Sequence, residues 1–145
     1  MLARRELSSA QLRERLSRKG LKPVEIEQAI HRLSREGALD DRRTAITYAR
    51  QAAIVKLRGP YRAVKELQAR GIRKNDAQSA VAEVFGEVDE QTVLNRALSR
   101  RLSGHVQNRV QFRRLYQYLL RQGFDGGMAA ATLRARAKAT AVPED

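Results

Sequence analysis

One phrase occurs three times along the chain, as Leu12-x3-Leu16-x3-Gly20-Leu21, as Ala63-x3-Leu67-x3-Gly71-Ile72 and as Leu115-x3-Leu119-x3-Gly123-Phe124. The three glycines are 51 and 52 residues apart. Apolar residues at a spacing of four mark one face of an α-helix, and a glycine just past the helix is typical of a left-handed C-terminal cap. A single copy would fit any amphipathic helix, but three evenly spaced copies indicate an internal repeat.

The register continues beyond each glycine. Apolar residues lie six and ten positions downstream in every copy, namely Ile26 and Ile30, Ala77 and Val81, and Ala129 and Leu133. Units of this size cannot bury their apolar faces alone, so neighbouring units must stack. Helix formers dominate and no sustained period-two run is present, which favours an all-α fold. We therefore expect three tandem three-helix repeats with a period of roughly 50 residues, stacked into an elongated and potentially curved molecule.

Helix-capping residues suggest where the units divide. The predicted boundaries are repeat 1 over residues 1–40, repeat 2 over residues 41–88, repeat 3 over residues 89–138 and a frayed tail over residues 139–145. Asp40 or Asp41 is expected to cap the first helix of repeat 2. Asn75 is predicted to cap a helix over residues 76–85 that ends at Gly86, and a last helix is expected to begin at Met128.

Charge is the strongest compositional feature of the 145 residues. Lys and Arg number 29 against 16 Asp and Glu, which gives a net charge of +13 and a pI near 11.1. Such an excess predicts a polyanionic partner, although a surface that is basic only for solubility would look the same. The chain has no cysteine, so it can form neither a disulfide nor a thiolate metal site.

The sequence carries no signal of secretion or of a membrane. Its first residues lack the apolar core of a signal peptide, and no stretch approaches the ~20 apolar residues that a bilayer span needs. We therefore expect a cytoplasmic protein without membrane contact.

Several stretches resemble the RecX family. The sequence Leu39-Asp40-Asp41-Arg42-Arg43-Thr44-Ala45 is similar to the family's Leu-Asp-Asp-x-Arg near the first repeat boundary. Residues 58–72, which read RGPYRAVKELQARGI, resemble its glycine loop and Arg-rich helix, and this is the most specific segment. The likeness covers roughly residues 1–135 and includes the opening residues 2–16. Thr44 departs from the family, which usually has an aromatic residue at this place.

The resemblance implies a non-catalytic regulator of the RecA recombinase. Such a protein lies along the groove of the RecA nucleoprotein filament, suppresses its ATPase and strand exchange, and limits filament growth. Neither a catalytic residue nor a cofactor comes with this resemblance. The implied partners are the RecA filament and single-stranded or duplex DNA held by a basic surface, and we expect the protein itself to be a monomer.

The basic residues concentrate in the third repeat. Residues 91–124 contain no acidic residue, and arginine there can grip phosphates or carboxylates with its planar fork. A second basic stretch precedes and follows Gly71, although Glu66 and Asp76 dilute it. The candidate binding residues for the RecA filament or DNA phosphates are Arg58, Arg62, Lys65, Arg70, Arg73, Lys74, Arg96, Arg100, Arg101, Arg109, Arg113, Arg114 and Arg121.

Other classes of function remain open at this point. Three-helix units with a basic helix would also suit a free-standing helix-turn-helix-like DNA-binding protein, and a structural adaptor would use the charge only for solubility. An enzyme finds little support, because the chain has no phosphate-binding glycine loop, no H-E-x-x-H and only His31 and His105. The adjacent carboxylates of Asp40 and Asp41 are explained by helix capping, so we expect no catalytic and no metal site.

Overall fold

A computed structural model describes residues 7–137, and within that range the chain forms helices and no strand. A single bridge pairs Val106 with Ala137. The predicted all-α fold is confirmed, while the predicted tail over residues 139–145 lies outside the described residues. The helices are α1 (Ser9–Arg18), α2 (Pro23–Arg35), α3 (Asp41–Ile54), α4 (Pro60–Ala69), α5 (Lys74–Glu87), α6 (Glu90–Ser99), α7 (Arg109–Gln122) and α8 (Gly126–Ala135).

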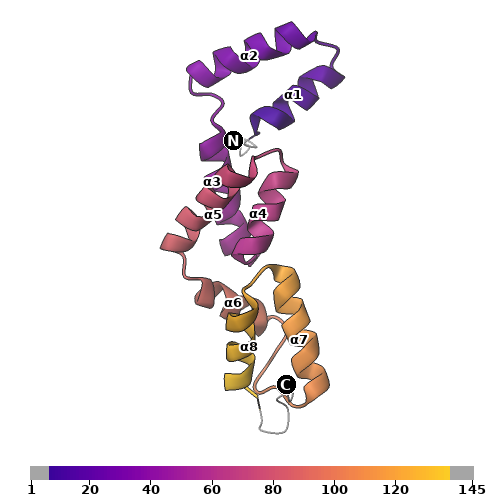
Figure 1. The fold of residues 1–145 in the computed structure, drawn as a ribbon, viewed down its shortest axis with the longest axis vertical. Coiled ribbons are helices and arrows are strands. Elements are labelled where there is room, and N and C mark those ends of the chain that lie inside the picture. The colour runs from indigo at the N-terminus through magenta and orange to yellow at the C-terminus, as the bar shows by residue number, and fades with distance from the viewer. Residues whose placement is uncertain (1–6, 138–145) are drawn as a thin grey trace.

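The helices form three units that follow one another along the long axis of the molecule (Figure 1). The first packs α1 on α2 around Ile26, Ile30 and Leu39. The second packs α3, α4 and α5 together around small residues and Leu67. The third holds α6, α7 and α8 around a core that includes Phe124. This arrangement is the expected elongated stack, while the exact boundaries at residues 40 and 88 stay a prediction.

The three repeated glycines end their helices in the same backbone conformation. Gly20, Gly71 and Gly123 have φ angles of 91°, 86° and 102°, in the left-handed region that residues with a Cβ rarely adopt. The apolar residues six and ten positions downstream of each glycine are all buried, as the repeat predicts. The repeated phrase is therefore a repeated structure.

The boundaries of helices α5 and α8 differ from the sequence prediction. Helix α5 begins at Lys74 with Arg73 as its N-cap, so Asn75 is not the cap, and it runs through Gly86 to Glu87. The extension carries Val88 to a place where it packs against both the second and the third core. Helix α8 begins at Gly126 because Asp125 accepts a hydrogen bond from the Met128 amide and caps it there.

The adjacent aspartates accept hydrogen bonds from the starts of two different helices. Asp40 accepts hydrogen bonds from the amides of Arg42 and Arg43 at the start of α3, which confirms the predicted cap. Asp41 instead accepts from the amide of Ser9 at the start of α1, 2.7 Å away, and from its hydroxyl. Both carboxylates are thereby engaged at helix starts, and Asp41 joins the first unit to the second.

Thr44, the departure from the family pattern, is fully buried at this contact. Its hydroxyl lies 3.4 Å from the carbonyl oxygen of Leu7, to which it donates a hydrogen bond. A polar contact between the units therefore takes the place of the aromatic packing that the resemblance implies.

The same kind of joint connects successive units. A Cβ on Gly71 would overlap the side chain of Ala10 at the start of α1, and a Cβ on Gly123 would overlap the backbone of Arg62 at the start of α4. In each case the glycine that ends a helix lies against the start of the corresponding helix in the preceding unit. The amides of Gly59 and Tyr61 reinforce the second joint, because they donate to the carbonyls of Gln122 and Gly123 at 2.8 and 3.1 Å.

Candidate nucleic-acid and protein interface

Two of the predicted binding residues, Arg58 and Arg62, hold the joint between the second and third units. The guanidinium groups of both donate to the side-chain oxygen of Gln122, at 2.9 and 3.0 Å. Both also pair with the carboxylate of Glu66, at 3.4 and 3.3 Å. Arg62 in addition donates to the carbonyl of Arg121 near the end of α7. The first role of these two arginines is therefore structural.

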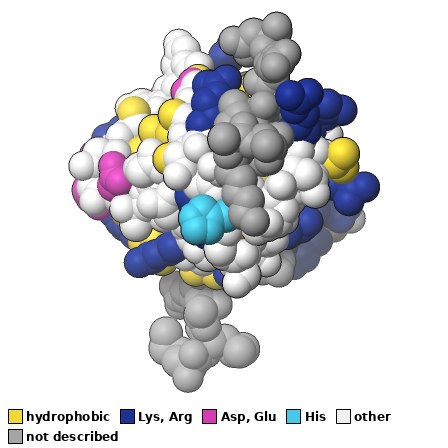
Figure 2. Space-filling view, turned by 90° about the horizontal axis from the view of Figure 1, so that it is seen from below, with side chains coloured by type: hydrophobic (Ala, Val, Ile, Leu, Met, Phe, Trp, Pro, Cys, Tyr) yellow, Lys and Arg dark blue, Asp and Glu magenta, His cyan; other side chains and the backbone are white. Residues whose placement is uncertain are grey.

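Six arginines of the acid-free stretch lie differently, because they are exposed and form no ion pair with a described residue. Arg96, Arg100, Arg101, Arg113, Arg114 and Arg121 are all exposed. Among residues 7–137, none of them forms an ion pair within 4.0 Å. Figure 2 views the molecule from the end formed by the third unit, and Lys and Arg side chains appear on several sides of it with few acidic ones. Uncompensated positive charge therefore surrounds this end.

The acidic residues that border this stretch serve as caps. Asp89 accepts from the amide of Thr92 at the start of α6, and Asp125 does so for α8. Glu90 accepts from the amide of Asp125 at 3.3 Å. Burial raises the pKa of the Glu90 carboxyl, and the hydrogen bond from Asp125 opposes that shift. These carboxylates stabilise helix starts and leave the arginines without counter-charges.

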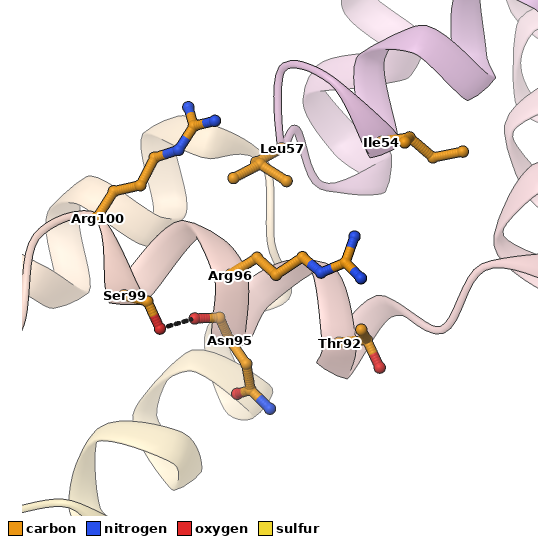
Figure 3. A pocket seen from close by; sticks show the side chains of 7 residues that line it. All are labelled: Ile54, Leu57, Thr92, Asn95, Arg96, Ser99 and Arg100. Atoms are coloured by element: carbon orange, nitrogen blue, oxygen red, sulfur yellow. Dashed lines mark hydrogen bonds between the residues drawn. The ribbon is translucent and has the colours of Figure 1, made fainter.

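A cleft of about 500 Å³ separates the end of α3 from α6, and we call it the α3–α6 cleft. Arg96 and Arg100 extend from α6 towards Ile54 and Leu57 on the other wall, as Figure 3 shows. Its lining contains no carboxylate and no aromatic ring. The remaining lining residues are the polar Thr92, Asn95 and Ser99. Two guanidinium groups beside an aliphatic wall can hold phosphate or carboxylate oxygens.

A second hollow, the α7 groove, has a volume of about 330 Å³. Arg101 lies over the ring of Tyr118, 4.3 Å from its centroid, and this contact fixes the guanidinium at the groove. The lining again lacks a carboxylate. It consists of Arg101, Gln111, Arg114, Leu115, Gln117, Tyr118 and Arg121.

A third hollow of about 440 Å³, the joint cleft, lies where α4 meets the end of α7. Its walls include the exposed side chains of Tyr61 and Leu120, together with Lys65 and Arg121. Glu66 also lines it, but that carboxylate is engaged by Arg58 and Arg62. Sequence reasoning had not selected Tyr61 or Leu120, because a lone apolar residue in an amphipathic helix is normally assigned to the core.

The other predicted binding residues are scattered. Arg70 lies over the ring of Tyr48, 3.8 Å from its centroid, on the second unit. Arg73 and Lys74 are exposed at the start of α5. Arg109, at the start of α7, has an interaction partner of its own. The structure thus brings together Arg96 with Arg100 in the α3–α6 cleft, and Arg101 with Arg114 and Arg121 in the α7 groove. Arg62 and Lys65 share the joint cleft with Arg121.

The buried face of α7 differs by one residue from the prediction. The sequence predicts Phe112, Leu115, Tyr116 and Leu119 inside, with Arg113, Arg114 and Arg121 outside. Tyr118 is buried in place of Tyr116, which is only half-buried. The three arginines are nevertheless exposed as predicted, and Tyr118 becomes the platform for Arg101.

No group of three or more His, Asp or Glu side chains within residues 7–137 is placed to hold a metal ion. No helix in that range combines the length and the apolar character that crossing a membrane demands.

Comparison with known proteins places the chain in a family. The family model for the RecX first three-helix domain matches residues 1–33. The regulatory protein RecX of Halorhodospira halophila is 32% identical over 148 residues, covering 100% of this chain and 85% of that protein. The regulatory protein RecX of Syntrophotalea carbinolica is 33% identical over 128 residues, covering 86% of this chain and 83% of that protein.

Solved structures share the fold. The crystal structure of RecX from Lactobacillus salivarius has a TM-score of 0.71 at 19% identity, covering 89% of this chain and 84% of that one. A second crystal structure, of a regulatory protein RecX, has a TM-score of 0.73 at 18% identity, covering 89% of this chain and 64% of that one. Because curated relatives that are 32% and 33% identical match 100% and 86% of its length, the chain belongs to the RecX family of regulatory proteins.

Proposed function

We propose that this protein is a non-catalytic regulator that binds the RecA–DNA filament and inhibits its ATPase, its strand exchange and its growth. Membership of the RecX family supports a regulatory role connected with RecA. The observation that carries the proposal is the set of exposed arginines in the third unit. Arg96 and Arg100 line the α3–α6 cleft, and neither that lining nor the lining of the α7 groove contains a carboxylate. The arginines of the α7 groove are Arg101, Arg114 and Arg121.

The chemistry of these hollows suits a nucleoprotein. Arginine binds phosphate and carboxylate oxygens with two parallel hydrogen bonds, and it is desolvated more readily than lysine. A filament offers both kinds of oxygen, on its DNA backbone and on acidic side chains of its protein. The elongated stack spreads its cationic hollows over more than one unit, so it can contact the filament at several points.

The proposal is tested by titrating the protein into the single-stranded-DNA-dependent ATPase of RecA from the same cell. Binding of the protein to the same DNA without RecA is measured in parallel. Inhibition below the ratio at which the protein could cover the DNA supports regulation of the filament. Inhibition that only follows DNA coverage would contradict it.

The same titration separates the alternative functions. Sequence-specific binding to duplex DNA with no effect on RecA would identify a free-standing helix-turn-helix-like protein. Binding to RecA that does not respond to salt would indicate an adaptor, because a contact with a polyanion releases counterions and weakens steeply as salt rises.

A further inference from the structure

We propose that one strand of DNA lies along the α7 groove and that one of its bases stacks on Tyr61 in the joint cleft. The inference deepens the proposed function, because it assigns a site to the single-stranded component of the filament. It rests on that function only for its biological setting, since strand binding can be measured without RecA.

The two hollows adjoin, because they share a lining residue. Arg121 lines both the α7 groove and the joint cleft. From Gln111 to Arg121 the α7 groove follows the helix for about 15 Å, at the helical rise of about 1.5 Å per residue. Arg101, Arg114 and Arg121 occur along it, and no ion pair with a described residue occupies them. A positively charged groove of this kind is what strand-binding proteins use to follow a phosphate backbone.

Tyr61 has the exposure and the support of a stacking platform. Its side chain is 62% exposed, and Leu120, on the other side of the cleft, is 41% exposed. Its backbone is held firmly, since its amide donates to the carbonyl of Gly123 at 3.1 Å and it follows Pro60. A ring exposed to this degree on a fixed backbone can take a base against its face without prior rearrangement.

The charges around Tyr61 also favour a strand. Glu66 is the acidic residue in the joint cleft, and Arg58 and Arg62 both pair with it. Lys65 and Arg121 are exposed and remain available for phosphates on either side of the stacked base. The cleft therefore combines an aromatic face, an aliphatic neighbour and two cations.

A single strand fits these features better than a duplex or a peptide. The faces of bases are accessible only when the bases are unstacked, so the ring of Tyr61 would gain little from a duplex. The α3–α6 cleft has no ring, and the ring in the α7 groove, Tyr118, is buried and covered by Arg101. Base stacking is therefore assigned to Tyr61 in the joint cleft.

The test compares two ligands of equal charge and length. One is an oligodeoxythymidine of about 15 nucleotides, within the site sizes of strand-binding domains, and the other is its abasic counterpart. The unmodified protein should bind the thymidine strand more tightly. Tyr61→Ala should weaken that binding about five- to hundredfold and abolish the difference between the ligands, whereas Tyr61→Phe keeps the ring and should stay within about twofold.

A matched control comes from Val110, an apolar residue of α7 that is 55% exposed and lines neither hollow. Val110→Ala should leave both affinities unchanged. Circular dichroism spectra and unfolding midpoints of all variants should match, because each altered side chain is mostly exposed. Arg121→Gln should weaken both ligands alike and lower the salt slope by about 0.7, as expected for one lost phosphate contact with a single strand.

The following outcomes would contradict either the stacking site or the proposed function. Equal affinity for the two ligands, or an unchanged Tyr61→Ala variant, would overturn the stacking site. Loss of RecA inhibition in Tyr61→Ala with unaltered thymidine binding would reassign the residue to a protein contact and also overturn it. Ring-dependent strand binding by a protein that does not inhibit RecA would leave this inference standing and reject the proposed function.

Discussion

Gly59 packs so closely on Gly123 that a Cβ on Gly59 would overlap the carbonyl group of Gly123. The atoms in conflict belong to the backbone, which cannot rotate away as a flexible side chain can. We expect Gly59→Ala to destabilise the protein by about 1–3 kcal/mol, the usual cost of overpacking. The free energy of unfolding in urea measures the effect.

Gly86 provides the control for this substitution. It lies inside α5, and no atom lies within 4 Å of the position its Cβ would occupy. Gly86→Ala should therefore stabilise the protein, by up to about 1 kcal/mol, through the better helix propensity of alanine. If both variants unfolded alike, the close approach of Gly59 to Gly123 would not contribute to stability.

Leu67 tests the repeat register within the second core. Its side chain is 1% exposed, and it occupies the second apolar position of the repeated phrase. Leu67→Ala should cost about 2–5 kcal/mol because it leaves a cavity among small neighbours that cannot collapse fully. Val24, 67% exposed on α2, is the comparison residue, and Val24→Ala should shift the unfolding midpoint little.

Arg113 and Arg114 test the charged surface of α7. Replacing both with Glu should reduce inhibition of the RecA filament and leave helix content intact, because both side chains are exposed. Arg32→Glu with Arg35→Glu, on α2, changes the net charge equally at the other end of the molecule. Equal loss of inhibition in the two double variants would mean that net charge, and not the third unit, determines binding.

Asp41 is the first residue of α3, but its side chain is predicted to stabilise α1. Asp41→Ala removes the acceptor for the Ser9 amide and should cost about 1 kcal/mol, as loss of an N-cap does. Hydrogen exchange should accelerate in α1 more than in α3. Asp40→Ala, which removes the cap of α3 itself, should show the reverse pattern.

Glu90 gives the protein a predicted pH dependence. Burial raises its pKa in the folded state, so the folded protein binds a proton more readily than the unfolded chain does. The Glu90 contribution to stability therefore falls as the pH rises from the ordinary glutamate pKa of about 4.3 through the raised value. Glu90→Gln should remove this decline in urea unfolding measured as a function of pH.

Glu27 should show the opposite dependence on pH, because its pKa is lowered in the folded protein. Its hydrogen bond from Arg13, 2.8 Å long, lowers its pKa. Its contribution is present above the ordinary glutamate pKa and is lost as the pH falls through the lowered value. Carboxyl resonances in nuclear magnetic resonance spectra should therefore titrate at a lower pH for Glu27 than for Glu90. A reversed order would contradict both assignments.

The fold was accessible from the sequence because its signals are local. A glycine at the end of an apolar stripe, such as Gly71, fixes a helix end through backbone geometry alone. The cap at Asp40 is local in the same way. The prediction that α5 ends at Gly86 was wrong, because the helix continues to Glu87. The packing of Val88 between two cores outweighs the modest helix cost of one glycine.

The candidate site was less accessible because its roles depend on distant partners. Arg58 looks like a free cation in the sequence, yet its partner Gln122 is 64 residues away. Tyr61 gains its significance only because α7 ends beside it. The absence of acidic residues from 91–124 can be read from the sequence. Only the folded structure shows that arginines of this stretch line two separate hollows.

The recurring joint has an evolutionary consequence. A glycine that ends a helix of one unit meets the start of the corresponding helix in the unit before it, and main-chain atoms contribute much of the contact at Gly123. Gly20, the corresponding residue of the first unit, has nothing within 4 Å of where its Cβ would stand. A duplication in register would present the same backbone shape on both sides of the inserted unit. Such proteins can therefore lengthen or shorten by whole units while their surfaces diverge independently.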